Sequence, residues 1–204
     1  MRRLVGRERG TAARLTRAIS LIDKYSKSLN LTGSVGMDGL WKQAGEAVAA
    51  VVAVERSLGR ELSVADRWLD VGSGGGFPGL VVASCVPADL FLLEPRAKRA
   101  AFLEMGLASL GGTGRRVMRG RLESGGLEGL APADSGALEA GGSFRILSAR
   151  AVFAPDLWVE RARVLAATES VVVLHLGCGD APPAGVRELA RVDFDRWSVA
   201  VVTV

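Results

Sequence analysis

The feature that most constrains the fold is a glycine-rich loop between a short apolar run and a helical stretch. The run Arg67–Val71 contains Asp70, and the segment from Gly72 to Gly79 that follows holds five glycines. Glycine lets a backbone turn tightly and approach a ligand, and the first turn of a helix leaves N–H groups without partners. The segment predicts a strand, loop and helix of an α/β fold, with a flat or anionic ligand held at the loop.

The chain after Gly59 alternates short apolar runs with helical stretches. The predicted strands are Arg67–Val71, Asp89–Leu93, Arg115–Arg119, Phe144–Ala149 and Ser170–Leu176. The predicted helices are Gly79–Cys85, Arg96–Leu110 and Pro155–Leu165. This alternation predicts a parallel sheet with covered faces. Two last runs, Arg187–Phe194 and Ser198–Val204, flank a short turn at Asp195–Trp197 and predict an antiparallel hairpin, so that the sheet has six strands or more.

Two helices are predicted before the first strand. From Thr11 to Leu29 the apolar residues recur at steps of three and four, with basic residues at the other positions, so one face docks while charge points outward. A second apolar helix covers Trp41 to Leu58. We expect one domain over residues 1–204, with a helical extension at 1–62, a Rossmann-like core at 63–204 and a mobile surface loop at 124–142.

Composition narrows the class of protein. With 49% apolar and 24% charged residues the chain is globular. No apolar run approaches the roughly 18 residues of a membrane span, and we find no secretory signal, so we expect a cytoplasmic protein with no membrane contact. Cys85 and Cys178 have no metal-ligand spacing, so we expect no metal site and no disulfide.

Basic residues gather in two segments. Residues 1–28 carry eight basic and two acidic side chains, and residues 95–121 carry seven and one, which gives each segment a net charge of +6. Clustered Arg and Lys attract phosphate backbones through counterion release. The segments favour nucleic acid as a partner, and a solvated arginine-rich surface is the alternative.

The second predicted strand ends at an acidic residue in a position that suits a nucleoside cofactor. Glu94 lies 20 residues beyond Gly74, where a carboxylate can accept hydrogen bonds from both ribose hydroxyls. Gly74, Gly76 and Gly79 match the GxGxxG pattern of dinucleotide sites, which is weak evidence alone. A dinucleotide site, and glycines that serve only strand–helix packing, are the two alternatives. No GxxxxGK[ST] pattern is present, which excludes a P-loop.

The loop also resembles the first motif of class I methyltransferases, in which a Leu-Asp-Val run precedes alternate glycines. Here Leu69–Val71 precedes Gly72, Gly74 and Gly76. The 60-residue helical segment before the loop favours this interpretation over a dinucleotide site. The resemblance implies S-adenosylmethionine as cofactor and a Rossmann-like class I sheet, and class-level reasoning adds Asp70, Gly74 and Glu94 to the cofactor site.

Motifs along nearly the whole chain resemble the RsmG (GidB) family, whose members methylate guanine N7 in small-subunit (16S) ribosomal RNA. In family order these motifs are Asn30–Thr32, Leu69–Gly79, Leu93–Glu94, Lys98–Leu103, Arg121–Glu123 and Arg150–Ala151. The resemblance implies this activity, with ribosomal RNA or an assembling ribosomal particle as partner. It further implies cofactor contacts from Gly72, Phe77, Leu122, Glu123 and Arg150. We expect a monomer.

Three positions depart from the family pattern. Gln43 and Glu46 stand where the family commonly has His and Asp, and Leu176 stands where it has Lys. These positions belong to the expected RNA-facing mouth of the site. Two alternatives therefore stay open, a methyltransferase with another RNA or non-RNA substrate and a non-catalytic RNA-binding relative.

Methylation of guanine N7 requires alignment rather than proton removal, because N7 has an available lone pair. No general base is expected, and Arg150 is the candidate catalytic residue through positioning. A structural arginine paired with a carboxylate is the alternative for Arg150. His175, the only histidine, lies in an apolar run and is interpreted as a packed core residue.

Overall fold

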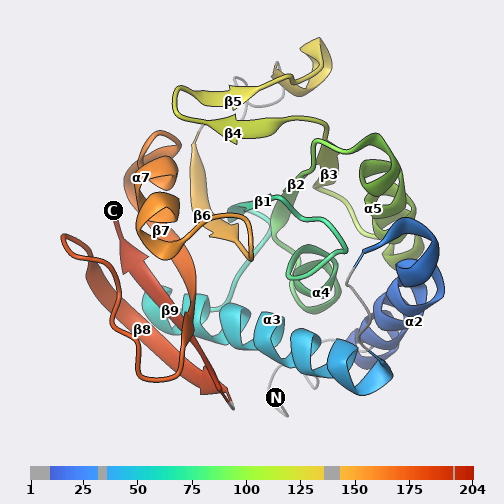
Figure 1. The fold of residues 1–204 in the computed structure, drawn as a ribbon, viewed down its shortest axis with the longest axis horizontal. Helices are drawn as coiled ribbons and strands as arrows, with labels where there is room; N and C mark the ends of the chain where they lie inside the picture. The colour runs from blue at the N-terminus through green and yellow to red at the C-terminus, as the bar shows by residue number, and fades with distance from the viewer. Residues whose placement is uncertain (1–9, 32–35, 136–142, 195) are drawn as a thin grey trace.

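The computed structural model describes residues 10–31, 36–135, 143–194 and 196–204, and it shows a large central sheet with helices against both faces (Figure 1). In the described segments the sheet has seven strands in the order β3-β2-β1-β6-β7-β9-β8. Their bounds are β1 Arg67–Val71, β2 Asp89–Leu93, β3 Arg115–Met118, β6 Phe144–Ala149, β7 Ala166–Gly177, β8 Arg187–Phe194 and β9 Trp197–Thr203.

The pairing of the strands confirms the predicted fold class. Strands β3, β2, β1, β6 and β7 are parallel to their neighbours, whereas β9 pairs antiparallel with both β7 and β8. From β1 the chain first builds outward through β2 and β3 and then returns to place β6 on the other side. This reversal opens a crevice at the carboxyl ends of β1 and β6, where α/β proteins bind ligands.

In the described segments α3, α4 and α5 cover one face of the sheet, α2 packs on these helices, and α7 lies against the other face (Figure 1). Their bounds are α2 Thr11–Leu29, α3 Met37–Leu58, α4 Gly79–Cys85, α5 Ala97–Leu110 and α7 Pro155–Arg163. Both predicted N-terminal helices pack into the core that includes Trp68, Ile146 and Val201 from the sheet. The Ala and Val residues of α3 allow it to lie closely along α4, β8 and β9. None of the helices in the described segments is long and apolar enough to cross a bilayer.

The prediction of one surface loop over 124–142 is wrong where the structure describes it. Gly126–Glu128 forms β5, which pairs antiparallel with β4 (Arg121–Glu123). Leu122 faces Leu127 across this pair, and both pack against the core on the α7 side of the sheet. A three-residue strand has no readable period, so the sequence did not reveal it. Residues 136–142 lie outside the described residues.

The outward-facing basic surface predicted for α2 is wrong for Arg14, which is half-buried, whereas Arg17 is exposed as predicted. Arg14 donates through Nε to the carbonyl of Ser84 over 3.1 Å, and Arg17 donates through Nη1 to the carbonyl of Ser109 over 2.8 Å. These carbonyls belong to the last turns of α4 and α5. Carbonyl groups at the end of a helix have no N–H partner within the helix and carry partial negative charge. The two arginines therefore hold α2 against the domain. Arg2, Arg3, Arg7 and Arg9, also part of the predicted basic segment, lie outside the described residues.

Candidate cofactor and substrate pocket

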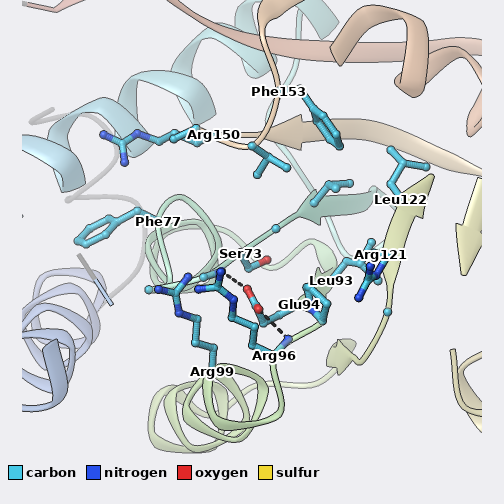
Figure 2. Close-up of a pocket in the computed structure, with 18 of the residues that line it drawn as sticks. Ser73, Phe77, Leu93, Glu94, Arg96, Arg99, Arg121, Leu122, Arg150 and Phe153 are labelled. Carbon is cyan, nitrogen blue, oxygen red and sulfur yellow. Dashed lines mark hydrogen bonds between the residues drawn. The ribbon is translucent and has the colours of Figure 1, made fainter. Parts of the chain in front are cut away.

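A pocket of about 660 Å³ lies at the carboxyl ends of β1, β2 and β6 (Figure 2). This volume is within the range of about 300–1,000 Å³ that is usual for small-molecule sites. The lining comes from the loop after β1, the turn after β2, the start of α5, β4, the loop after β6 and single residues at the end of α2 and in α3. Figure 2 shows Phe77 and Arg150 on one side of Glu94 and Leu122 on the other.

The glycine loop forms the floor of the pocket because its backbone is fixed to the neighbouring strand. The N–H groups of Gly72 and Ser73 both donate to the carbonyl of Leu93, over 2.8 and 3.1 Å. Gly72 has a φ of +70°, which favours glycine. A Cβ added there would overlap Val152 Cγ2 in the loop after β6. The backbone angle therefore favours glycine at this position, and any side chain there would also require Val152 to move.

Glu94 anchors the opposite wall through both carboxylate oxygens. Its Oε2 accepts from the backbone N–H of Gly74 over 3.0 Å, and its Oε1 accepts from that of Arg96 over 2.9 Å. The side chain is buried yet lines the pocket. A carboxylate has about four acceptor positions. Glu94 can thus hold the loop and still accept hydrogen bonds from a ligand's hydroxyl groups.

Asp70 lies behind the loop and is not part of the pocket lining. Its Oδ1 accepts from the Ser148 hydroxyl over 2.8 Å, and Ser148 in turn accepts from the Trp68 indole over 2.8 Å. Complete burial raises the pKa of Asp70 to about 6, against the opposing effect of the Ser73 and Ser148 hydroxyls. The carboxyl group thus connects β1 to β6 beneath the site.

Arg150 extends from the end of β6 toward two side chains of α3. It donates through Nε and Nη2 to Glu46 Oε2, over 3.0 and 2.7 Å, and through Nη1 to Gln43 Oε1 over 3.2 Å. Glu46 is 3% exposed and Arg150 is 21% exposed. Burial by itself would raise the pKa of Glu46, but the nearby His175 and Arg150 together hold it below its usual value. The geometry pairs Arg150 with a carboxylate and also leaves it in the pocket wall.

Seven of the eight residues predicted to bind the cofactor line this pocket, namely Gly72, Gly74, Phe77, Glu94, Leu122, Glu123 and Arg150. Their roles toward a ligand stay predictions. His175 is 7% exposed on its side chain, lies beside Glu46 and is not part of the lining. Sequence reasoning missed Leu31, Val152 and Phe153, which also line the pocket. Val152 and Phe153 directly follow the Arg150–Ala151 motif, and this adjacency in sequence was the signal that could have identified them as pocket residues.

The structure divides the basic segment 95–121 between two ends of the sheet. Arg96, Arg99 and Arg121 line the pocket. Arg115 instead donates to the carbonyls of Gly111 and Val86 at the amino end of β3. Arg99 also ties α5 to the end of α2, because its Nη2 donates to the carbonyl of Asn30 over 2.5 Å. Only part of the basic segment therefore contributes positive charge to the pocket.

The sequence of this chain matches the model of a known protein family over most of its length. The GidB model, described as rRNA small subunit methyltransferase G, matches residues 11–175 and so covers every residue predicted to bind the cofactor. The chain belongs to the GidB family. Within the matched range, Gln43 and Glu46 both contact Arg150.

Curated members of the GidB family give the same result over part of their length. A ribosomal RNA small subunit methyltransferase G from Chelativorans sp. (strain BNC1) is 41% identical over 91 residues, which are 43% of this chain and 40% of that protein. One from Rhodopseudomonas palustris (strain BisB18) is 36% identical over 121 residues, which are 57% and 48% of the two chains. These matches span less than half the length of either relative.

Solved structures share the fold of this GidB member at low sequence identity. MtNAS in complex with MTA and tNA aligns over 95% of this chain and 70% of its own, with a TM-score of 0.57 and 15% identity. Aeropyrum pernix fibrillarin, with natively bound S-adenosyl-L-methionine, aligns over 80% and 76%, with a TM-score of 0.53 and 15% identity. The Rossmann-like methyltransferase fold predicted from the glycine loop is confirmed.

Proposed function

We propose that this protein binds S-adenosylmethionine in the pocket and transfers its methyl group to guanine N7 of small-subunit (16S) ribosomal RNA. The observation that carries the proposal is the match to the GidB model over residues 11–175, because it includes the pocket-lining loop, Glu94 and Arg150. Curated relatives named ribosomal RNA small subunit methyltransferase G support the methyltransferase activity and the RNA class. We further propose that the protein acts in the cytoplasm as a monomer, on the RNA or on an assembling particle.

The residues of the pocket fit this cofactor. Glu94 would accept hydrogen bonds from the ribose hydroxyls, while Leu122 and Glu123 would flank the adenine. Gly72 keeps the loop free of a side chain, and Phe77 lies on the same side of Glu94 as Arg150 (Figure 2). The sequence predicts a contact between Asp70 and the cofactor. We propose instead that its carboxyl group, which interacts with the Ser73 hydroxyl and the backbone of Gly79, supports the loop from behind.

The reaction places few chemical demands on the protein. The bound cofactor supplies an electrophilic methyl group on sulfur. The lone pair of guanine N7 forms the new N–C bond while the C–S bond breaks with its electrons going to sulfur, so no proton has to be removed. The pocket walls would align the two reactants and exclude water, and such positioning contributes much of an enzyme's rate enhancement. Arg150 would act by positioning.

The test is methyl transfer to ribosomal particles. Small subunits from cells that lack this modification would be incubated with the protein and isotopically labelled S-adenosylmethionine, and the RNA analysed by mass spectrometry for 7-methylguanosine. We expect one modified guanine, and no transfer by Gly72→Arg. Cofactor binding without transfer would indicate another substrate, whereas a folded wild-type protein that binds neither S-adenosylmethionine nor the particle would contradict the proposal.

A further inference from the structure

The contacts of Arg150 determine which atoms face the pocket from α3. Arginine has five N–H donors and no acceptor. Three of these N–H groups are used, two on Glu46 and one on Gln43. One N–H on each of Nη1 and Nη2 is thus left over. Arg150 lines the pocket, and these two N–H groups have no acceptor among the described residues.

The same chemistry fixes the orientation of the Gln43 amide. Because a guanidinium only donates, Gln43 must direct its carbonyl oxygen to Arg150, and its Nε2 group points elsewhere. Gln43 lines the pocket, and Nε2 is hydrogen-bonded to none of the described residues. The amide therefore adds two N–H donors beside those of Arg150.

The acceptors of this cluster are held behind the donors. Glu46 is nearly fully buried, its Oε2 is occupied by Arg150, and its Oε1 lies 3.7 Å from His175 Nδ1. At the opposite wall a carboxylate offers acceptors. The Glu94 wall thus offers carboxylate acceptors together with the donors of Arg96 and Arg99, whereas Arg150 and the Gln43 amide nitrogen on the α3 side offer donors.

We propose that Gln43, held by Arg150, binds an oxygen acceptor of the ligand through its amide N–H groups. This inference rests on the proposed function and names Gln43 as a specificity-determining residue. Two oxygens suit such donors, the carboxylate of the cofactor's methionine group and the O6 carbonyl of the target guanine, which adjoins N7. Adenine presents an amino donor at the place of O6. An O6 contact would therefore select guanine.

The key variant is Gln43→Glu, which keeps an acceptor for Arg150 and removes both N–H donors. If Gln43 only braces Arg150, this variant behaves as wild type. Gln43→Met provides a second variant, which adds no charge and loses both the donors and the acceptor of the amide. Lys42→Gln is the matched control, because it changes the net charge by the same amount one residue away on an exposed side chain that does not line the pocket.

The experiment combines calorimetric titration with kinetics on small ribosomal subunits. The titrants are S-adenosylmethionine and 5′-methylthioadenosine, which lacks the amino-acid group. In both Gln43 variants we expect about a tenfold or greater loss, as for a hydrogen bond to a charged or desolvated group. Weaker binding of S-adenosylmethionine alone assigns the carboxylate. Unchanged binding with reduced kcat/KM assigns guanine O6.

Two results would overturn the inference. One is a Gln43→Glu protein within twofold of wild type in both measurements. The other is an equal loss of affinity for both titrants, because that indicates a distorted pocket rather than a lost contact. The wild-type titration and transfer assay test the proposed function separately, so either proposal can fail without the other.

Discussion

At the scale of single residues, Gly72 has two independent reasons to be glycine, and they can be separated experimentally. Its φ of +70° strains any L side chain, and an added Cβ meets Val152. Gly59, at the end of α3, has a φ of +66° with nothing within 4 Å of an added Cβ. It therefore reports the backbone strain by itself.

We expect Gly59→Ala to lower the free energy of unfolding by about 1–2 kcal/mol and Gly72→Ala to lower it by more, because the clash adds to the strain. Adding Val152→Ala to Gly72→Ala should recover only the part of the loss that exceeds the loss in Gly59→Ala, because it removes the clash and leaves the backbone strain. Urea denaturation of the four variants, including Val152→Ala alone, measures these terms. Equal costs at Gly59 and Gly72 would show that the contact with Val152 is unimportant.

Asp70 gives the protein a pH-dependent stability. Its pKa in the folded protein is about 6, above its ordinary value of 3.8. The folded state therefore holds this proton more tightly than the unfolded chain, and stability falls as pH rises between these two values.

Asp70→Asn removes this dependence. The free energy of unfolding of wild type minus that of the variant should fall by on the order of 3 kcal/mol from pH 4 to pH 7. Asp38→Asn, at an exposed position in the first turn of α3, controls for the loss of one carboxylate. Denaturation curves at several pH values decide the point, and a constant difference between wild type and Asp70→Asn would contradict it.

At the scale of elements, the Glu46–Arg150 pair joins α3 to the end of β6. Removing one partner of a buried ion pair leaves an uncompensated charge. Glu46 is much more buried than Arg150, which retains contact with the pocket. The loss of Arg150 should therefore cost more than the loss of the charge on Glu46.

We expect Arg150→Met to destabilise the fold by about 2–4 kcal/mol at pH 7.5, and adding Glu46→Gln to restore part of this. Without Arg150 only His175 opposes the effect of burial, so the pKa of the Glu46 carboxyl group rises. The cost should therefore shrink toward pH 5, where that carboxylate takes up a proton. A double-mutant cycle at both pH values checks this. Equal costs at both would mean that Glu46 stays solvated without Arg150.

At the scale of the whole molecule, some basic side chains line the pocket and others lie at the opposite edge of the sheet. Arg96 and Arg121 line the pocket, whereas Arg187 is exposed at the start of the edge strand β8. Its partner Thr203 pairs with Val171 in β7. Val171 is level with Ile146 in β6 and so with Trp68 near the start of β1, toward the amino edge of the sheet. Arg187 is therefore a matched cation at the edge opposite the pocket.

Replacing Arg96 and Arg121 by Gln should weaken RNA binding and reduce the slope of log Kd against log salt by roughly 0.7 for each lost phosphate contact. Arg187→Gln should leave both unchanged. Binding of 16S ribosomal RNA at several salt concentrations measures the slope. If all three replacements reduce it alike, the attraction depends on net charge rather than on the surface around the pocket.

The sequence by itself determined most of the elements and the residues of one pocket wall. The ends of β1, β2, α4 and β6 were predicted to the residue, and the loop from Gly72 with Glu94 was predicted as the ligand site. These features follow from local rules, because apolar periodicity and glycine conformation depend on residues close in the chain. Family membership followed from motifs of the same local kind.

The tertiary structure decided which distant side chains meet. Gln43 and Glu46 reach Arg150 across more than 100 residues, and Val152 closes over Gly72. Arg14, predicted to face outward, is half-buried and binds the end of α4, and the exposed Arg17 binds the end of α5. Each outcome depends on how the faces of helices and strands pack together, and no pattern within one segment contains that information.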